Sequence, residues 1–180
     1  PSIPNRVGIE HRPQVVEDRA RYGDWEGDLI VGAGQSGYVL TLVERKSLLT
    51  LTRKLDSKDA EKVADAIIDA FMDIPPYWIK TATFDNGTEF ACHERVARET
   101  GATIYFADPY SSYQRGTNEN TNGLIRRVLP KKMSFSKLTQ ERLNIIEEEL
   151  NNRRRKKLKF ESPNDVFKKQ RQKHLVAINA

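Results

Sequence analysis

The hydrophobic residues of the chain repeat with two different periods, and the order in which these periods follow one another limits the possible folds. The alternation typical of β-strands covers residues 24–31, 38–43, 48–55, 78–85 and 102–106. Helical spacing covers residues 14–21, 58–74, 93–100, 117–128, 139–152 and 163–173. The first three strands follow one another directly, which predicts an antiparallel meander. The whole order predicts a mixed α/β fold with a five-stranded sheet and flanking helices.

Several short motifs refine this prediction. The segment Gly32–Gly37 matches the glycine pattern of a dinucleotide-binding loop, but a β-rich run follows it, so we interpret it as a hairpin turn. Ser57 is predicted as the N-cap of the first long helix, and Gly101 as the C-cap of the next. Ser162, with Asp165 three residues later, has the pattern of a capping box.

Composition excludes several classes of protein. Of the 180 residues, 38% are hydrophobic, which is enough for a buried core and excludes a wholly disordered chain. The single cysteine excludes a disulfide framework, and the scattered histidines argue against a zinc site. The apolar runs are too short to span a membrane, and no secretory signal is visible. We therefore expect a cytoplasmic protein with no membrane partner.

The positive charge is concentrated at one end of the sequence. The net charge is +5 overall, but residues 151–180 carry a net +8, which leaves −3 for the rest of the chain. The segment Arg153–Lys159 contains six cations in seven residues. Such a segment is typical of contacts with the phosphate backbone of a nucleic acid, although a solvated helix end has the same appearance. We expect three parts: a lead-in (1–23), a core (24–150) and a basic helical segment packed on or extending the core (151–180).

Three acidic residues stand out by their position in the predicted elements. Asp28 lies in the middle of the first strand, where aspartate is uncommon, and Asp85 lies at the end of the fourth. Glu119 lies in the first turn of a helix that follows a polar loop. Three carboxylates from two strands and a helix suit a pair of Mg²⁺ ions, which prefer oxygen ligands. Ordinary solvated surface acids remain the alternative at this point.

Three sequence motifs resemble those of a known family. The motifs are Asp24-Trp25-Glu26-Gly27-Asp28, then Thr83-Phe84-Asp85-Asn86-Gly87-Thr88-Glu89-Phe90, and finally Asp108-Pro109-Tyr110-Ser111-Ser112 leading to Gly116-Thr117-Asn118-Glu119-Asn120-Thr121-Asn122-Gly123. As a set they resemble the catalytic core of bacterial IS-thirty-type insertion-sequence transposases. This family belongs to the retroviral-integrase-like, DDE superfamily. The spacing agrees, because 33 residues separate Asp85 from Glu119. Arg154 departs from the family, which often has proline at this position.

The resemblance implies a fold, an activity and a site. The fold is ribonuclease H-like, and the activity is metal-dependent cleavage of DNA strands and their transfer to target DNA. Asp28, Asp85 and Glu119 become the catalytic, metal-binding triad, which by the resemblance holds two ions of Mg²⁺ or Mn²⁺. Glu26, Glu89 and Asp108 are ranked lower. The expected DNA contacts are Arg115, Asn122, Arg126, Arg153, Arg154, Arg155, Lys156 and Lys157.

The resemblance also implies partners. These are double-stranded DNA, as element ends and target, and further copies of the chain, as a homodimer or larger assembly on DNA. In a bacterium the protein would associate with the nucleoid when bound to DNA. Residues 1–23 are too short for the helix-turn-helix of the family, so we expect the recognition of terminal repeats to lie outside this sequence. Two alternatives stay open: a ribonuclease H-like nuclease that only hydrolyses, and a catalytically idle DNA-binding or assembly module.

Overall fold

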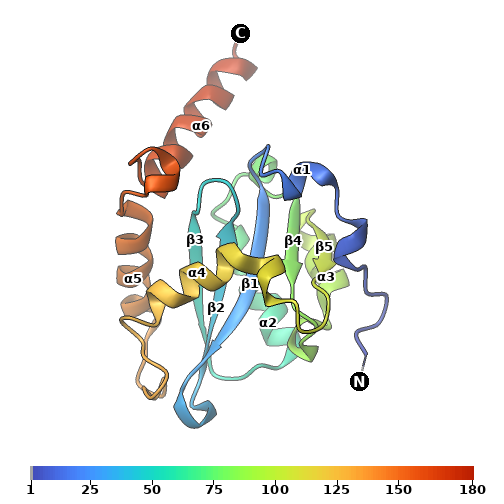
Figure 1. Ribbon diagram of the computed structural model, residues 1–180, viewed down its shortest axis with the longest axis vertical. Coiled ribbons are helices and arrows are strands. Elements are labelled where there is room, and N and C mark those ends of the chain that lie inside the picture. Colours follow the sequence, from blue (N-terminus) through green and yellow to red (C-terminus); the bar gives the residue numbers. More distant parts are fainter. Residues whose placement is uncertain (1) are drawn as a thin grey trace.

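The structure is a computed structural model that describes residues 2–180, and it is built on one five-stranded sheet (Figure 1). The strands are β1 (Asp24–Val31), β2 (Tyr38–Glu44), β3 (Thr50–Leu55), β4 (Thr81–Phe84) and β5 (Thr103–Phe106). Their order across the sheet is β3-β2-β1-β4-β5. The first three strands form an antiparallel meander, and β4 and β5 run parallel to β1. The predicted mixed sheet and the predicted hairpin at Gly32–Gly37 are both confirmed.

Helices cover both faces of the sheet. They are α1 (Gln14–Glu17), α2 (Ala60–Phe71), α3 (His93–Thr100), α4 (Gly116–Ile125), α5 (Gln140–Asn152) and α6 (Pro163–Ile178). Short 3₁₀ helices occupy Ile9–His11, Ala33–Gln35, Pro76–Trp78, Thr88–Phe90, Ser112–Arg115 and Lys156–Leu158. Figure 1 shows α4 crossing one face of the sheet, α2 lying behind the other, and α6 extending away from the body. None of these helices combines the length and apolarity that crossing a bilayer demands.

Alternation along the strands divides the hydrophobic interior into two clusters, one on each face. Leu40 and Leu42 of β2 pack with Val63 and Ile67 of α2 on one side. The neighbouring residue Val39 packs on the other side, in the cluster formed with α4 and α5. Both faces of the central strands are therefore buried, so that any charged residue on them needs a partner within the protein.

The outer edge of the sheet is closed by polar side chains of α5. The backbone amides of Thr50, Thr52 and Lys54 in β3 donate to the side chains of Asn151, Glu147 and Gln140, at 2.9, 2.9 and 2.8 Å respectively. An uncovered edge strand presents unpaired backbone groups to other chains. Helix α5 therefore completes the hydrogen bonding of β3 and fixes its own position along this edge.

Both ends of the described chain contact the sheet or its loops. In the lead-in, Ile3 is buried in the larger cluster and Gly8 forms a parallel bridge with Phe106 of β5. In α6, Phe167 packs edge-on against Trp78, and His174 stacks on Tyr77 with ring centroids 3.6 Å apart. Helix α6 is thus attached, through Phe167 and His174, at the end of the sheet where β1 and β4 begin.

The structure corrects some predicted boundaries and caps. The N-cap of α2 is Asp59, whose side chain accepts from the amide of Glu61, and Ser57 instead accepts from the amide of Asp59. The prediction of Ser57 as the N-cap is therefore wrong, and Asp59, two positions later, has this role. Trp78, which begins the predicted strand 78–85, is buried but lies in a 3₁₀ helix, since Pro75-Pro76 starts a turn before β4. The caps at Gly101 (φ 80°) and Ser162 are confirmed.

Candidate active site

Strand β1 directs Glu26 and Asp28 toward α4. Successive side chains of a strand point to opposite faces, so Glu26, Asp28 and Ile30 share one face. Ile30 lies in the cluster with α4 and α5, whereas Trp25 lies in the cluster with α2. Position 27 requires glycine, because a Cβ at this position would collide with the ring of Phe84. In the motif around Asp28, Gly27 thus lets the Phe84 side chain of β4 lie close to β1, and Glu26 and Asp28 lie on the face that α4 covers.

Asp85 follows β4, the strand next to β1. These strands are parallel, and Glu26 is paired with Thr83, so Asp28 and Asp85 each lie two residues further along neighbouring strands. The Asp85 side chain accepts from the amide of Gly87 at 2.9 Å, which holds the turn after the strand. Carboxyl ends of parallel strands are common ligand positions in open α/β sheets. The structure brings two of the three predicted carboxylates together here.

The guanidinium of Arg115 joins these two carboxylates. Its Nη1 lies 3.4 Å from Asp28 Oδ2, and its Nη2 lies 3.7 Å from Asp85 Oδ2. Arg115 is only 6% exposed, and Nη1 also donates to the backbone oxygen of Gly27 at 3.3 Å. The sequence predicted Arg115 as a contact for DNA phosphate, whereas the structure gives it acidic partners inside the site.

Helix α4 contacts the same carboxylate through Asn122. Its Nδ2 donates to Asp28 Oδ2 at 3.1 Å, and its Oδ1 accepts from the hydroxyl of Thr41 at 2.9 Å. Asn118, one turn earlier, donates to the Thr41 hydroxyl at 3.1 Å. This network fixes the register of α4 on β1 and β2. Asn122, which the sequence predicts as a DNA contact, has protein partners here.

Glu119 lies on α4 between these asparagines, one turn before Asn122, and its side chain is exposed. It shares the helix that holds Asp28, but no interaction of its carboxylate with Asp28 or Asp85 is present in the described residues. Across residues 2–180, no three His, Cys, Asp or Glu side chains form a group that could hold a metal ion. The three predicted carboxylates therefore do not form one cluster among the described residues, and Glu119 is exposed on α4, one turn before the asparagine that contacts Asp28.

The electrostatic surroundings of Asp28 raise its pKa above the usual value. Burial is the largest cause and raises the pKa of Asp28, Arg115 opposes this shift, and the nearby charge of Asp85 adds to it. A cation placed between the two aspartates offsets the cost of burying their charges and reduces the repulsion between them. Arg115 supplies such a cation in this structure.

The lower-ranked acids have different surroundings. Glu26 is fully buried, pairs with Arg45 at 2.5 Å, and accepts from the backbone amide of Asn118 at 2.7 Å. Burial raises the pKa of Glu26, while Arg45 and the Asn118 amide oppose the shift. Asp108 accepts from Gln114 at 2.9 Å in the loop before α4. Glu26 thus joins strand and helix structurally, and sequence reasoning missed its partner Arg45.

A hollow lies beside Asp85. It has a volume of about 440 Å³, and its walls come from the turn after β4, the loop at residues 107–112 and Arg115. Tyr110 projects fully into solvent from this loop, with a positive φ of 59°. The hollow gives access from solvent to the Asp85 and Arg115 side of the site.

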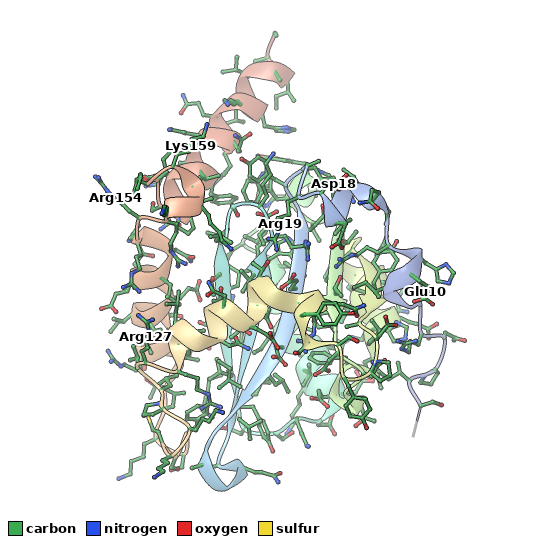
Figure 2. All side chains as sticks on the ribbon, in the orientation of Figure 1. Glu10, Asp18, Arg19, Arg127, Arg154 and Lys159 are labelled. Carbon is green, nitrogen blue, oxygen red and sulfur yellow. The ribbon has the colours of Figure 1, made fainter. Side chains whose placement is uncertain are left out.

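The basic residues after α5 form a groove with α4. Its lining consists of Leu48, Asn120, Leu124, Arg127 and Arg153–Lys157, and its volume is about 280 Å³. Figure 2 shows Arg127 and Arg154 on the same side of the molecule. The side chains of Arg153, Arg154, Lys156 and Lys157 are exposed. We call this surface the basic groove.

Two predicted DNA-contact arginines are occupied by protein partners. Arg126 donates to the backbone oxygens of Val31 and Leu129, at 2.8 and 3.3 Å, and burial lowers its pKa. Arg155 donates to the oxygen of Leu150 at 2.9 Å, and burial lowers its pKa as well. These contacts anchor α4 and the basic groove, so the exposed neighbours are the better candidates for phosphate.

Sequence comparisons match the chain to transposases. It is 45% identical over 166 residues to the transposase of insertion sequence element IS4351 from Bacteroides fragilis, covering 92% of this chain and 51% of that protein. It is 42% identical over 168 residues to the transposase InsI of element IS30A from Escherichia coli K12, covering 93% of this chain and 44% of that protein. The chain therefore spans about half the length of the curated relatives it matches. No model of a protein family matches it.

Structural comparisons match the same region to integrases. The catalytic core domain of BIV integrase superposes with a TM-score of 0.63 and 18% identity, covering 86% of this chain and 99% of that domain. A chain of the simian T-cell lymphotropic virus intasome gives a TM-score of 0.59 and 18% identity over 72% of this chain and 48% of that one. These likenesses confirm the ribonuclease H-like fold. Over more than nine-tenths of its length, the chain is therefore a homologue of the transposases of IS30-type insertion sequences, as its motifs predicted.

Proposed function

We propose that this chain is the catalytic domain of a DDE transposase, which cleaves DNA at the ends of a mobile element and transfers the strand to target DNA. The observation that carries the proposal is the pair Asp28 and Asp85 on adjacent parallel strands, facing a helix that bears Glu119, in a homologue of transposases. The relatives are full transposases, so activity, substrate and partners are assigned to this chain as part of the proposal.

The residues fit divalent cations. Asp28 and Asp85 already share one cation, the guanidinium of Arg115, and their carboxylate oxygens are the ligand type that Mg²⁺ and Mn²⁺ prefer. We assign Asp28, Asp85 and Glu119 as the ligands of two such ions. Bound there, the ions would lower the pKa of water and stabilise charge on the phosphate oxygens during phosphoryl transfer.

The residues of the chain have separate tasks in this reaction. Asn122 donates to Asp28 Oδ2, the oxygen that also faces Arg115, and the backbone amide of Leu29 donates to Asp28 Oδ1 at 2.9 Å, so the orientation of this carboxylate is fixed. The bonds of Asn118 and Asn122 to Thr41 keep α4, and with it Glu119, at a fixed position along β2, the strand next to β1. A shift of about 1 Å in a reacting group can cost roughly a hundredfold in rate. These hydrogen bonds therefore support catalysis by holding Glu119 in place.

A ribonuclease H-like nuclease is the nearest rival function, since it would use the same carboxylates. The experiment supplies a labelled duplex with a free 3′-hydroxyl, an unlabelled target duplex and Mg²⁺ or Mn²⁺. The proposal expects label to appear in longer, joined products. Shortened products alone would favour the nuclease, and no metal-dependent product of either kind would favour an idle DNA-binding module.

We further propose that the basic groove holds the DNA backbone. Changing Arg153, Arg154, Lys156 and Lys157 together to Gln should weaken binding to every duplex to a similar degree. It should also reduce the slope of log K against log salt by roughly three to four, because each phosphate contact releases about 0.9 counterions. Filter binding or fluorescence anisotropy at several salt concentrations measures both effects.

The matched control changes the same number of cations elsewhere. Lys168, Lys169, Arg171 and Lys173 are exposed on α6, away from the basic groove. The control should lose less affinity and keep most of the salt slope. Equal losses in the two variants would show that net charge, and not the groove, attracts DNA. A loss limited to one sequence would indicate base recognition at the groove.

Assembly and location complete the proposal. We expect the chain to act as a homodimer or larger assembly on element ends and target DNA, in the bacterial cytoplasm. The solved intasome among its structural neighbours is an assembly, which supports this expectation. Light scattering with and without a terminal-repeat duplex tests it directly.

A further inference from the structure

A buried arginine between two carboxylates at a proposed metal site calls for an explanation. Arg115 is 6% exposed, and both of its terminal nitrogens are directed to acidic partners. Its Nε is buried and has no hydrogen-bond partner among residues 2–180. A guanidinium placed for structural support normally satisfies its donors, since an unpaired buried donor costs free energy. The Nε of Arg155 is also buried and unpaired, but Arg155 forms no salt bridge within residues 2–180, so what sets Arg115 apart is its place between two carboxylates.

The distances indicate attraction by charge and not a well-formed hydrogen-bonded pair. The separations of 3.4 and 3.7 Å exceed the about 2.7–2.9 Å of charge-assisted hydrogen bonds. In the same chain, Arg45 lies 2.5 Å from Glu26, with its Nε donating to the oxygen of Val16. The buried pair at Glu26 is thus tightly bonded, whereas Arg115 neutralises two aspartates with looser contacts.

We infer that Arg115 is a built-in counter-ion, which occupies the cation position between Asp28 and Asp85 until divalent metal displaces it. The inference rests on the proposed function for the identity of the metal. It explains why the aspartates can lie close together without repelling each other apart, and why Glu119 is exposed instead of gathered onto them. Metal and guanidinium compete for the same carboxylate oxygens, so Arg115 lowers the affinity of the site for metal.

The structure provides a place for the displaced side chain. Arg115 lines the hollow of about 440 Å³ beside Asp85. It ends the 3₁₀ helix Ser112–Arg115 and precedes α4, with φ −123° and ψ 38°, so its side chain can turn without breaking a helical hydrogen bond of α4. A guanidinium in the hollow would face the solvent-open side of the site, where a phosphate would approach. Metal loading would thereby release a cation for the substrate.

The test compares Mn²⁺ binding, without DNA, in the wild-type chain and in Arg115→Gln, using the electron paramagnetic resonance signal of free Mn²⁺. We expect Arg115→Gln to bind Mn²⁺ roughly tenfold or more tightly, because a unit positive charge close to both ligands has been removed. Arg115→Lys, which keeps the charge, should stay near the wild type. Arg98→Gln, an equal charge change at an exposed position on α3, is the control for net charge.

A second measurement uses the wild-type chain and does not depend on the folding of a variant. The ¹⁵Nε resonance of Arg115, assigned by its loss in Arg115→Lys, should shift on addition of Mg²⁺ and exchange faster with solvent. A resonance that stays in place at saturating Mg²⁺ would overturn the inference, as would equal or weaker Mn²⁺ binding by Arg115→Gln.

The outcomes also separate this inference from the proposed function. If the wild type binds Mn²⁺, Asp28→Asn abolishes that binding and Arg115→Gln leaves it unchanged, the metal site stands and the counter-ion role falls. If neither the wild type nor Arg115→Gln binds Mn²⁺, both the metal site and the counter-ion role fall.

Discussion

Replacing any one of Asp28, Asp85 and Glu119 by its amide should reduce strand cleavage and joining by about a thousandfold or more. Each change keeps the shape of the side chain and removes a charged metal ligand. Bound metal contributes several kcal/mol to charge stabilisation in the transition state, and each ~1.4 kcal/mol is a tenfold change in rate. Gel assays of Asp28→Asn, Asp85→Asn and Glu119→Gln with labelled element-end duplexes measure the loss.

The control is Glu89→Gln, which removes an acid from the same motif as Asp85. Glu89 lies in the 3₁₀ helix Thr88–Phe90 and lines the space between α2 and α3, not the site. Glu89→Gln should retain substantial activity. Near-wild-type activity in any one of the three triad variants, with its fold intact by circular dichroism, would remove that residue from the assignment.

The expected result for Glu119→Gln is the most stringent test of the triad assignment. Asp28 and Asp85 are already joined through Arg115, whereas Glu119 is exposed and reaches the pair only if its side chain turns inward. Its assignment rests on the motif and on its place one turn before Asn122. A full loss of activity in Glu119→Gln would therefore support the gathering of the triad when metal and DNA bind.

The fold could be predicted from the sequence where a pattern is local. The alternation in β1 and β2, the hairpin at Gly32–Gly37 and the capping box at Ser162 all depend on residues close in the chain, and all are confirmed. Boundaries were less accurate where two residues competed for one role. Asp59 caps α2 in place of Ser57, and α6 continues to Ile178, beyond the predicted 173.

The partners of the candidate site could not be predicted, because they depend on contacts between distant segments. Arg115 lies 87 positions from Asp28 in the sequence, and the pattern around it is that of a polar loop. Arg45 comes from the turn between β2 and β3, and nothing nearby indicates that it enters the interior to meet Glu26. One signal was available: a charged residue within a buried strand requires a compensating charge somewhere in the fold.

Removing either partner of the Glu26–Arg45 pair should produce the largest loss of stability. Both side chains are buried, with relative exposures of 0% and 5%, and Glu26 also accepts from the amide of Asn118 at the start of α4. Breaking a buried ion pair on one side leaves an uncompensated charge, which costs about 3–5 kcal/mol. Glu26→Gln and Arg45→Gln should each lower the free energy of unfolding by this amount, measured by urea denaturation.

The double variant tests whether the loss comes from the unpaired charge. Glu26→Gln with Arg45→Gln removes both charges of the pair and leaves neither uncompensated, so it should be less destabilised than the sum of the two single variants. Arg53→Gln is the surface control, because its partners Asp69 and Asp73 are exposed, and it should cost at most about 1 kcal/mol. Since Glu26 also holds the first turn of α4, the single variants should loosen Glu119 as well. Activity lost in Glu26→Gln would then reflect this support, and recovery in a stabilised background would distinguish it from a ligand role.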